Sequence, residues 1–319
     1  MKNNKNIMLS GFDNKEISIF KKKFKNLTFF KYENFKKSKI VYNAFISKNR
    51  KSFEKFYNKD YQKVKSNLSW LHVSASGIEK YPKILKKSKF TLTNSKRIQG
   101  PEVADHAFAL LLSLTRNLNL TIKYGQNVKF SKRPIELNNK KILIIGFGGI
   151  GKCISERANG FAMKVSALNL NPCITPKYVK KLYSVKQYKK ALHDKDVVIY
   201  SVPLTKKTKK MYNSRTSKYF KKGAILINIS RGEVVCQKTL YKNLKNNYLH
   251  GAGVDVFGKD NKLNNKSKFS KLKNFVFTPH IAGISDNVNH RNEKLINDNL
   301  KNFSKNKKLI NIIIKKNLL

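Results

Sequence analysis

The chain has 319 residues, enough for two domains of ordinary size, and 40% of them are hydrophobic, so compact cores are expected. No apolar run is long enough to cross a membrane as a helix, and the N-terminal segment is too poor in apolar residues for a signal peptide. The three cysteines lack metal-type spacing, and no histidine or carboxylate cluster has it either. We therefore expect a cytoplasmic protein with free thiols, no metal and no membrane partner.

The formal net charge of +50 raises the question of nucleic-acid binding. Only eight of the 68 basic residues are arginines, which leaves 60 lysines, and these are spread along the chain. Proteins that recognise nucleic acids usually also need arginine for bidentate contacts. We therefore attribute the charge to compositional bias. It favours acidic substrates and weak polyanion binding, and we expect no specific nucleic-acid partner.

The first 95 residues alternate strand-like runs with lysine-rich helical stretches. An amphipathic helix is predicted over residues 14–26. Strands are predicted over residues 7–12, 27–32, 39–46, 68–75 and 90–94. This βαβ alternation predicts a parallel sheet.

A long, largely apolar helix is predicted over residues 101–123, where Pro101 suits the first turn. A second alternating series and a C-terminal helix follow it. The strands of this series are predicted over 141–147, 164–170, 196–204, 224–230, 251–257 and 275–280, and the helices over 149–161, 185–194, 216–223, 239–247 and 287–303. Six strands with intervening helices predict a doubly wound, dinucleotide-binding sheet, so the fold class is α/β with a Rossmann domain.

The first strand of this series leads into the glycine pattern GxGxxG, which opens a helix. Gly146 permits the tight turn, Gly148 lets backbone amides approach a pyrophosphate, and Gly151 lets the helix pack closely on the strand. Gly149 and Ile150 begin the helix, whose N-terminus attracts anions. The pattern therefore predicts a dinucleotide site, and a glycine-rich turn of another α/β protein is the alternative.

The second strand of the series ends at Asn169, where the dinucleotide fingerprint usually has an acidic residue that binds the adenosine ribose. An asparagine side chain can hydrogen-bond a ribose hydroxyl, but it does not repel a 2′-phosphate. No arginine follows to bind such a phosphate. NAD(H) is therefore the favoured cofactor, and NADP(H) is not excluded.

Several ordered motifs extend this interpretation. They are LTNSKRIQGPEVADHAFALLLSLTR, the glycine-rich loop, VPLTKKT, LINISRGEVV, GAGVDVF and TPHIAG. From about Trp70 to its end, the chain resembles the D-isomer-specific 2-hydroxyacid dehydrogenase family, with glyoxylate and hydroxypyruvate reductases among its members. The resemblance implies a Rossmann cofactor domain over residues 96–285. It also implies a flavodoxin-like substrate domain built from residues 1–95 and 286–319, a cleft between the two domains, and a homodimer.

The resemblance also implies catalytic roles. Arg231 would bind the carboxylate of a 2-keto acid and polarise its carbonyl group. His280 would donate a proton to the carbonyl oxygen, because the pKa of a histidine lies near neutral pH. Asp260 stands where the family usually has a glutamate before proline, and it would pair with His280. Because aspartate is one methylene shorter, Asp260 could instead be an ordinary loop residue.

Other positions are assigned by the same resemblance. Asp255 would hold the nicotinamide carboxamide, and Pro203 and Thr208 would line the cofactor. Ser76 and Gly77, in the turn after the strand at 68–75, would bind the substrate carboxylate through backbone amides. A plain strand-to-helix turn is the alternative there. The remaining histidines, including His106, are interpreted as structural or surface groups.

Together these features predict an NAD(P)-dependent oxidoreductase that transfers a hydride between its cofactor and a small D-2-hydroxy acid or 2-keto acid. The alternative is a dinucleotide-binding regulatory or scaffold protein of the same fold, with weak or no activity.

Overall fold

The computed structural model describes residues 4–37, 40–75, 81, 89–96, 98–128, 133–258 and 267–313. The chain forms two compact units. The first unit combines Met1–Ile98 with Asp286–Leu319, and the second unit is Gln99–Ser285. Each unit is built on its own parallel sheet, which confirms the predicted α/β class with two such sheets.

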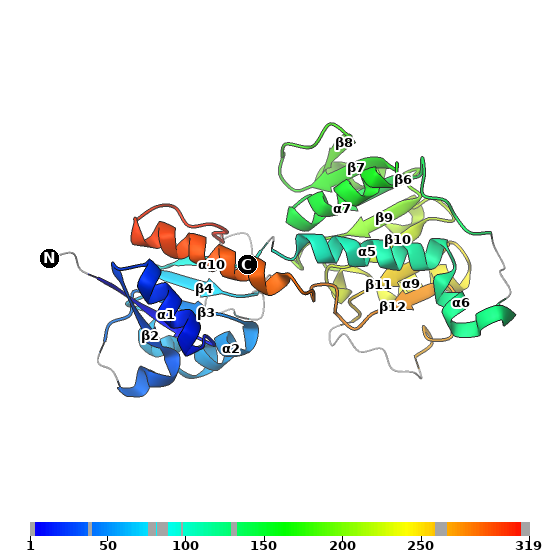
Figure 1. Cartoon of the computed structure of the whole chain (residues 1–319). Helices are drawn as coiled ribbons and strands as arrows, with labels where there is room; N and C mark the ends of the chain where they lie inside the picture. Colours follow the sequence, from blue (N-terminus) through cyan, green and yellow to red (C-terminus); the bar gives the residue numbers. More distant parts are fainter. Residues whose placement is uncertain are drawn as a thin grey trace. The chain divides into compact units, whose positions relative to one another are not determined.

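The first unit has five parallel strands in the order β2-β1-β3-β4-β5 (Figure 1). This order is that of flavodoxin-like folds, as predicted. The strands are β1 (Lys5–Ser10), β2 (Leu27–Lys31), β3 (Ala44–Ser47), β4 (Trp70–Val73) and β5 (Thr91–Asn94). The helices are α1 (Asn14–Lys23), α2 (Arg50–Lys59), α3 (Tyr61–Val64) and α10 (Val288–Ser304), and the 3-10 helix is η1 (Tyr32–Lys37).

Alternating side chains of the strands pack on both faces of this sheet. Ile7 and Leu9 of β1 belong to a core with Phe20 of α1 and Leu300 of α10, whereas Met8 belongs to a core with α2 and α3. The C-terminal helix α10 therefore completes a sheet whose strands all come from the first 94 residues (Figure 1). Burial on both faces explains the apolar character of these short strands.

The second unit has seven parallel strands in the order β12-β11-β10-β9-β6-β7-β8. The first six strands in chain order follow the Rossmann arrangement, and β12 extends the sheet beside β11. The strands are β6 (Lys141–Ile145), β7 (Lys164–Asn169), β8 (Val179–Ser184), β9 (Val197–Tyr200), β10 (Ile225–Asn228), β11 (Gly251–Val254) and β12 (Phe275–Phe277).

Helices cover both faces of this sheet. The helices α5 (Gly100–Thr115) and α7 (Gly149–Gly160) pack side by side on one face, where they share a core with Ile142 and Ile144 of β6 (Figure 1). Side chains of α8 (Tyr188–Leu192) and α9 (Gln237–Lys245) pack with Leu143 and Ile145 on the other face. Short 3-10 helices join these elements: η2 (Gly125–Asn127), η3 (Val185–Gln187), η4 (Ser217–Tyr219) and η5 (Gly232–Val234).

Three predicted elements of the second unit need correction. The prediction of six strands was wrong by one, because β8 has lysines at two of its six positions and so resembles a loop, as edge strands often do. The predicted helix 101–123 is two helices, α5 and α6 (Leu118–Tyr124), separated by Asn117 in the left-handed conformation at φ 56°. The predicted helix 216–223 is only the three-residue η4.

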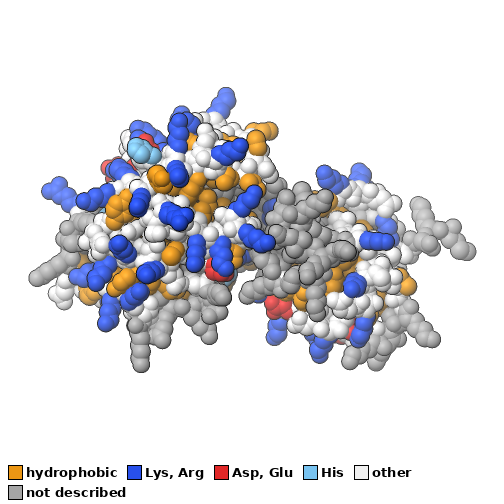
Figure 2. All heavy atoms as spheres, turned by 180° about the vertical axis from the view of Figure 1, so that it is seen from behind, with side chains coloured by type: hydrophobic (Ala, Val, Ile, Leu, Met, Phe, Trp, Pro, Cys, Tyr) orange, Lys and Arg blue, Asp and Glu red, His pale blue; other side chains and the backbone are white. Residues whose placement is uncertain are grey.

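Lysine and arginine side chains are scattered over the face shown in Figure 2, with apolar and uncharged atoms between them. The charge therefore does not form a single stripe on this face. Among the described residues, no helix is long and apolar enough to cross a membrane.

Candidate active site

The glycine-rich loop lies between β6 and α7, at the carboxyl edge of the seven-stranded sheet. Gly146 has φ 97°, a conformation that only glycine adopts readily, and a Cβ atom there would lie 2.6 Å from the carbonyl oxygen of Ser201. At Gly151 a Cβ atom would lie 2.1 Å from the carbonyl oxygen of Gly146. The turn and the start of the helix are therefore packed backbone against backbone.

Gly148 differs from these two glycines, because a Cβ atom there would meet nothing within 4 Å. It is the N-cap of α7, and no side chain of the described chain caps this helix. The first amide groups of α7, at Gly149 and Ile150, therefore have no side-chain acceptor there. An uncapped helix N-terminus behind an open glycine fits the pyrophosphate of a dinucleotide.

Asn169 ends β7 beside this loop, and its amide group holds local backbone. Its Oδ1 accepts a hydrogen bond from the backbone amide of Phe147 at 3.2 Å. Its Nδ2 donates to the carbonyl oxygen of Asn171 at 3.0 Å and lies 3.6 Å from the sulfur of Cys173. Asn169 thus orients the glycine-rich loop and adds no negative charge beside it.

The loop after β9 is the next segment at this edge. The hydroxyl of Ser201 donates to the carbonyl oxygen of Gly146 at 2.8 Å and so joins this loop to the glycine-rich loop. The hydroxyl of Thr208 donates to the carbonyl oxygen of Pro203 at 2.6 Å and accepts from the amide of Thr205 at 2.8 Å. Thr208 therefore stabilises this loop through contacts within it. The contact of Ser201 with the glycine-rich loop is one that our sequence interpretation did not identify.

Arg231 follows β10 and is half-buried. Its Nη1 donates to the carbonyl oxygen of Ser230 at 2.7 Å. Asn228 orients this turn, because its Oδ1 accepts from the hydroxyl of Ser230 at 2.6 Å and its Nδ2 donates to the carbonyl oxygen of Arg231 at 3.0 Å. A Cβ atom at Gly232 would lie 2.3 Å from the carbonyl oxygen of Gly258, so the loops after β10 and β11 touch.

His280 follows β12, the neighbour of β11 in the sheet. It is solvent-exposed and has φ 60°, which is rare for a residue other than glycine. Its backbone amide donates to the carbonyl oxygens of Asp255 at 2.8 Å and Thr278 at 3.0 Å. Because β10, β11 and β12 are adjacent, the turns that carry Arg231, Asp255 and His280 follow one another along the same edge.

Asp255, which ends β11, is only 1% exposed and organises the loop of His280. Its Oδ1 accepts hydrogen bonds from the hydroxyl of Thr278 at 2.7 Å and from the amide of Ile281 at 2.9 Å. Its Oδ2 accepts from the amide of Ala282 at 3.1 Å. The carboxylate therefore binds the side chain of Thr278 before His280 and the backbone amides of Ile281 and Ala282 after it.

Three of the predicted site residues lie outside the described residues. They are Ser76, Gly77 and Asp260. Ser74, just before the predicted substrate turn, is described, and its hydroxyl donates to the carbonyl oxygen of Ser47 at the end of β3. Among the described residues no group of three histidine, cysteine or carboxylate side chains could hold a metal ion.

Asn292 of α10 joins three strand ends of the first unit, a contact that our sequence interpretation did not identify. Its Oδ1 accepts from the hydroxyl of Ser95 at 2.6 Å, after β5. Its Nδ2 donates to the carbonyl oxygen of Lys48 at 3.1 Å, after β3, and to the hydroxyl of Ser74 at 3.2 Å, after β4. One buried amide group therefore joins the ends of β3, β4 and β5.

The sequence of the chain is similar to a known protein family and to characterised relatives. Residues 108–282 match the family model described as D-isomer specific 2-hydroxyacid dehydrogenase, NAD binding domain. The chain is similar to a glyoxylate reductase of Pyrococcus furiosus, with 36% identity over 225 residues that cover 67% of this chain and 66% of that protein. A glyoxylate reductase of Thermococcus kodakarensis is 34% identical over 220 residues, which cover 66% of this chain and 65% of that protein. The matches thus span slightly less than two thirds of these relatives.

Solved structures share the fold over nearly the whole chain. A D-mandelate dehydrogenase of Rhodotorula graminis superposes with a TM-score of 0.84 at 20% identity and covers 98% of both chains. A D-isomer specific 2-hydroxyacid dehydrogenase family protein of Aeromonas salmonicida superposes with a TM-score of 0.76 at 24% identity, over 98% of this chain and 99% of that chain. At these identities the superpositions establish the common fold.

Proposed function

Because the chain belongs to the D-isomer specific 2-hydroxyacid dehydrogenase family, we propose that it is an NAD(P)-dependent oxidoreductase acting on a small D-2-hydroxy acid or 2-keto acid. The observation that carries the proposal is the order of loops at one sheet edge. The glycine-rich loop follows β6, and the turns of Arg231 and His280 follow β10 and β12. The second unit would bind the cofactor and the first unit the substrate.

Arg231 and His280 would divide the chemistry between them. The nicotinamide cofactor, when bound, supplies or accepts the hydride. The guanidinium of Arg231 would bind the substrate carboxylate and polarise the neighbouring carbonyl group. The imidazole of His280 would hand a proton to the carbonyl oxygen during reduction and remove it during oxidation. Asp260 remains our prediction for the partner of His280, and Ser76 and Gly77 remain predictions for carboxylate binding.

Glyoxylate and hydroxypyruvate are the substrates that we propose first. The likeness to glyoxylate reductases supports this choice. The high positive charge of the chain also favours small anions.

Oxidation of NADH or NADPH with glyoxylate, hydroxypyruvate and pyruvate tests the activity. The variants His280→Ala and Arg231→Ala should lower kcat/KM at least ~100-fold, because general acid catalysis and charge stabilisation each contribute about that much. Binding of NADH, followed by its fluorescence, should stay close to wild type. A wild-type protein that binds NADH but oxidises it with no substrate of the panel would favour the alternative, a regulatory or scaffold protein.

NAD(H) is our preferred cofactor, and NADP(H) is the alternative. Asn169 supplies no negative charge against a 2′-phosphate, and its donor group is already bound to Asn171. The variant Asn169→Asp should lower kcat/KM with NADPH more than with NADH, because a carboxylate repels the phosphate. An unchanged ratio would mean that this position does not contact the adenosine ribose.

A homodimer in the cytoplasm completes the proposal. Ile122 of α6 is 84% exposed, and Leu118 on the same helix is also exposed, as a subunit contact would require. All three cysteines are free thiols, as expected in a reducing compartment. Sedimentation velocity should give the mass of a dimer for the wild type and of a monomer for Ile122→Asp. A monomeric wild type would refute the dimer.

A further inference from the structure

One histidine of the second unit that has no role in the proposed chemistry is joined to the loop of His280. His106 lies on α5, and its Nε2 is 2.7 Å from Oγ1 of Thr278 and 3.4 Å from Oδ1 of Asp255. We propose that His106 is a positioning residue, which acts through Thr278 and Asp255 to hold His280 in place for proton transfer. The proposal rests on the proposed function, because it assigns His106 to the same site.

The direction of the hydrogen bonds follows from the chemistry of a hydroxyl group. Thr278 has one O–H group, and an ionised carboxylate can only accept, so this O–H donates to Oδ1 of Asp255 at 2.7 Å. Oγ1 of Thr278 must then accept the N–H at Nε2 of His106. The chain of donors therefore runs from His106 to Thr278 to Asp255, and it places the proton of a neutral His106 on Nε2.

Asp255 transmits this contact to the backbone around His280. Its two oxygens accept the amides of Ile281 and Ala282, and its carbonyl oxygen accepts the amide of His280. The side chain is buried, so its charge needs strong donors to be stable there. Among the described residues, His106 is the only basic side chain within 4.0 Å of this carboxylate.

His106, the first donor in this series of hydrogen bonds, lies on the well-packed helix α5. Ala104, Ala107 and Leu110 of this helix are buried in the core against α7 and the sheet. The side chain of His106 is 18% exposed, so it is largely enclosed as well. A catalytic group is held best when its supports lie on packed helices and strands. By contrast, His280 sits on an exposed turn, with a left-handed backbone that few side chains adopt.

Two pairs of variants test the proposal. The first pair is His106→Leu, which removes the donor, and His106→Gln, whose amide group can still donate to Thr278. The second pair is Thr278→Val and Thr278→Ser, which remove and keep the hydroxyl. The surface variant His193→Gln is the control for loss of a histidine, because His193 is exposed and lies far along the chain.

The expected result separates positioning from general stability. His106→Leu and Thr278→Val should lower kcat about 10-fold to 100-fold, the usual cost of losing a group that orients an active imidazole. His106→Gln and Thr278→Ser should recover most of this loss, and KM for NADH should change little in all four. Equal losses in the Leu and Gln variants, or no loss in either, would overturn the proposal.

Histidine-selective NMR gives a second measurement that does not depend on turnover. The ring signal of His280 is identified by its absence in His280→Asn. In His106→Leu this signal should shift and broaden, and in His106→Gln it should stay near its wild-type position. An unperturbed signal in His106→Leu refutes positioning even if the enzyme is active. Conversely, a shifted signal supports positioning even if no substrate of the panel is reduced, which would instead refute the proposed function.

Discussion

The carboxyl edges of the two sheets are held together in different ways. In the second unit, the contacts are divided among several residues: Gly151 packs on Gly146, Ser201 binds the glycine-rich loop, and Asp255 binds residues 278–282. In the first unit, a single asparagine of α10 reaches back about 200 residues to bind Ser74 and Ser95. The contacts at the edge in the second unit are therefore spread over several side chains, whereas one amide group of α10 joins three strand ends in the first unit.

This difference determines how each edge should respond to mutation. A substitution in the second unit should mainly disrupt the loops that the replaced residue contacts, because the contacts of this edge are divided among several side chains. A substitution at Asn292 should affect three strand ends together, because β3, β4 and β5 share that one amide group. The following variants test this contrast.

The largest effect is expected from Gly151→Ala. The added Cβ would lie 2.1 Å from the carbonyl oxygen of Gly146, so the loop or the helix must move. NADH binding should fall below detection, and the second unit should lose about 3 kcal/mol of unfolding free energy, the upper range for overpacking. Isothermal titration calorimetry and urea unfolding measure the two effects.

Gly160→Ala is the matched control on the same helix, because its Cβ would meet nothing within 4 Å. It should bind NADH like the wild type. If Gly151→Ala also bound NADH normally, the packed glycine loop would not be needed for the cofactor.

Asp255→Ala should have the next largest effect. It leaves the amides of Ile281 and Ala282 and the hydroxyl of Thr278 without their acceptor, at a cost of about 1–3 kcal/mol for each group that stays buried. We expect loss of activity and a lower unfolding free energy for the second unit. The control is Asp105→Ala, which removes the exposed ion-pair partner of Arg157. It should lower the unfolding free energy by less than ~1 kcal/mol. Similar losses for both variants would contradict a special role for Asp255.

Asn292→Leu tests the shared amide group of the first unit. The leucine keeps the volume but removes three hydrogen bonds, so the first unit should lose about 2–3 kcal/mol. Because Ser74 precedes the predicted substrate turn, KM for the keto acid should rise while NADH affinity stays the same. Asn297→Ala, on the same helix, should change neither. A selective loss of NADH affinity would contradict the division of labour between the units.

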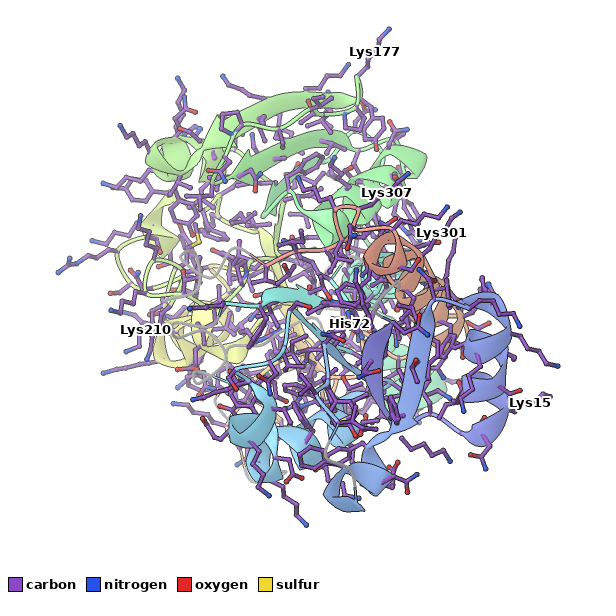
Figure 3. The ribbon with its side chains drawn as sticks, turned by 90° about the vertical axis from the view of Figure 1, so that its left-hand side faces the viewer. Lys15, His72, Lys177, Lys210, Lys301 and Lys307 are labelled. Atoms are coloured by element: carbon purple, nitrogen blue, oxygen red, sulfur yellow. The ribbon has the colours of Figure 1, made fainter. Side chains whose placement is uncertain are left out.

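A smaller, pH-dependent effect is expected at His72. This histidine is fully buried in β4, and desolvation lowers its pKa to about 3. Figure 3 shows His72 in the interior, whereas Lys15 and Lys301 on α1 and α10 point outward. In the unfolded chain the pKa is near ~6.5, so the unfolded state binds the proton first as pH falls. Stability is therefore full above ~6.5 and should be about 2 kcal/mol lower at pH 5 than at pH 7.

The fluorescence of Trp70 measures this effect. It is the single tryptophan of the chain, it lies in the first unit, and its ring centroid is 6.3 Å from that of His72. Urea unfolding at pH 7 and pH 5 should show the loss in wild type and in His193→Gln, but not in His72→Gln. The same loss in His72→Gln would assign it to other groups.

Much of the second unit could be predicted from sequence, because the glycine pattern, the strands and the TPHIAG loop are short, continuous motifs. The contacts of Asn292 with Ser95 and of His106 with Thr278 could not be predicted this way, because the partners lie far apart in the sequence. The strand β8 was not predicted because its two adjacent, exposed lysines interrupt the alternation of apolar and polar residues. The binding of a nicotinamide carboxamide by Asp255 stays a prediction.

The left-handed backbone of His280 has a consequence for how this position can vary. Such a conformation costs a residue with a side chain roughly 1–2 kcal/mol, and glycine avoids that cost. A glycine here would therefore make the protein more stable and would remove the imidazole. The histidine is thus a residue that selection for stability alone would replace, which is the pattern expected from the catalytic role that we propose for it.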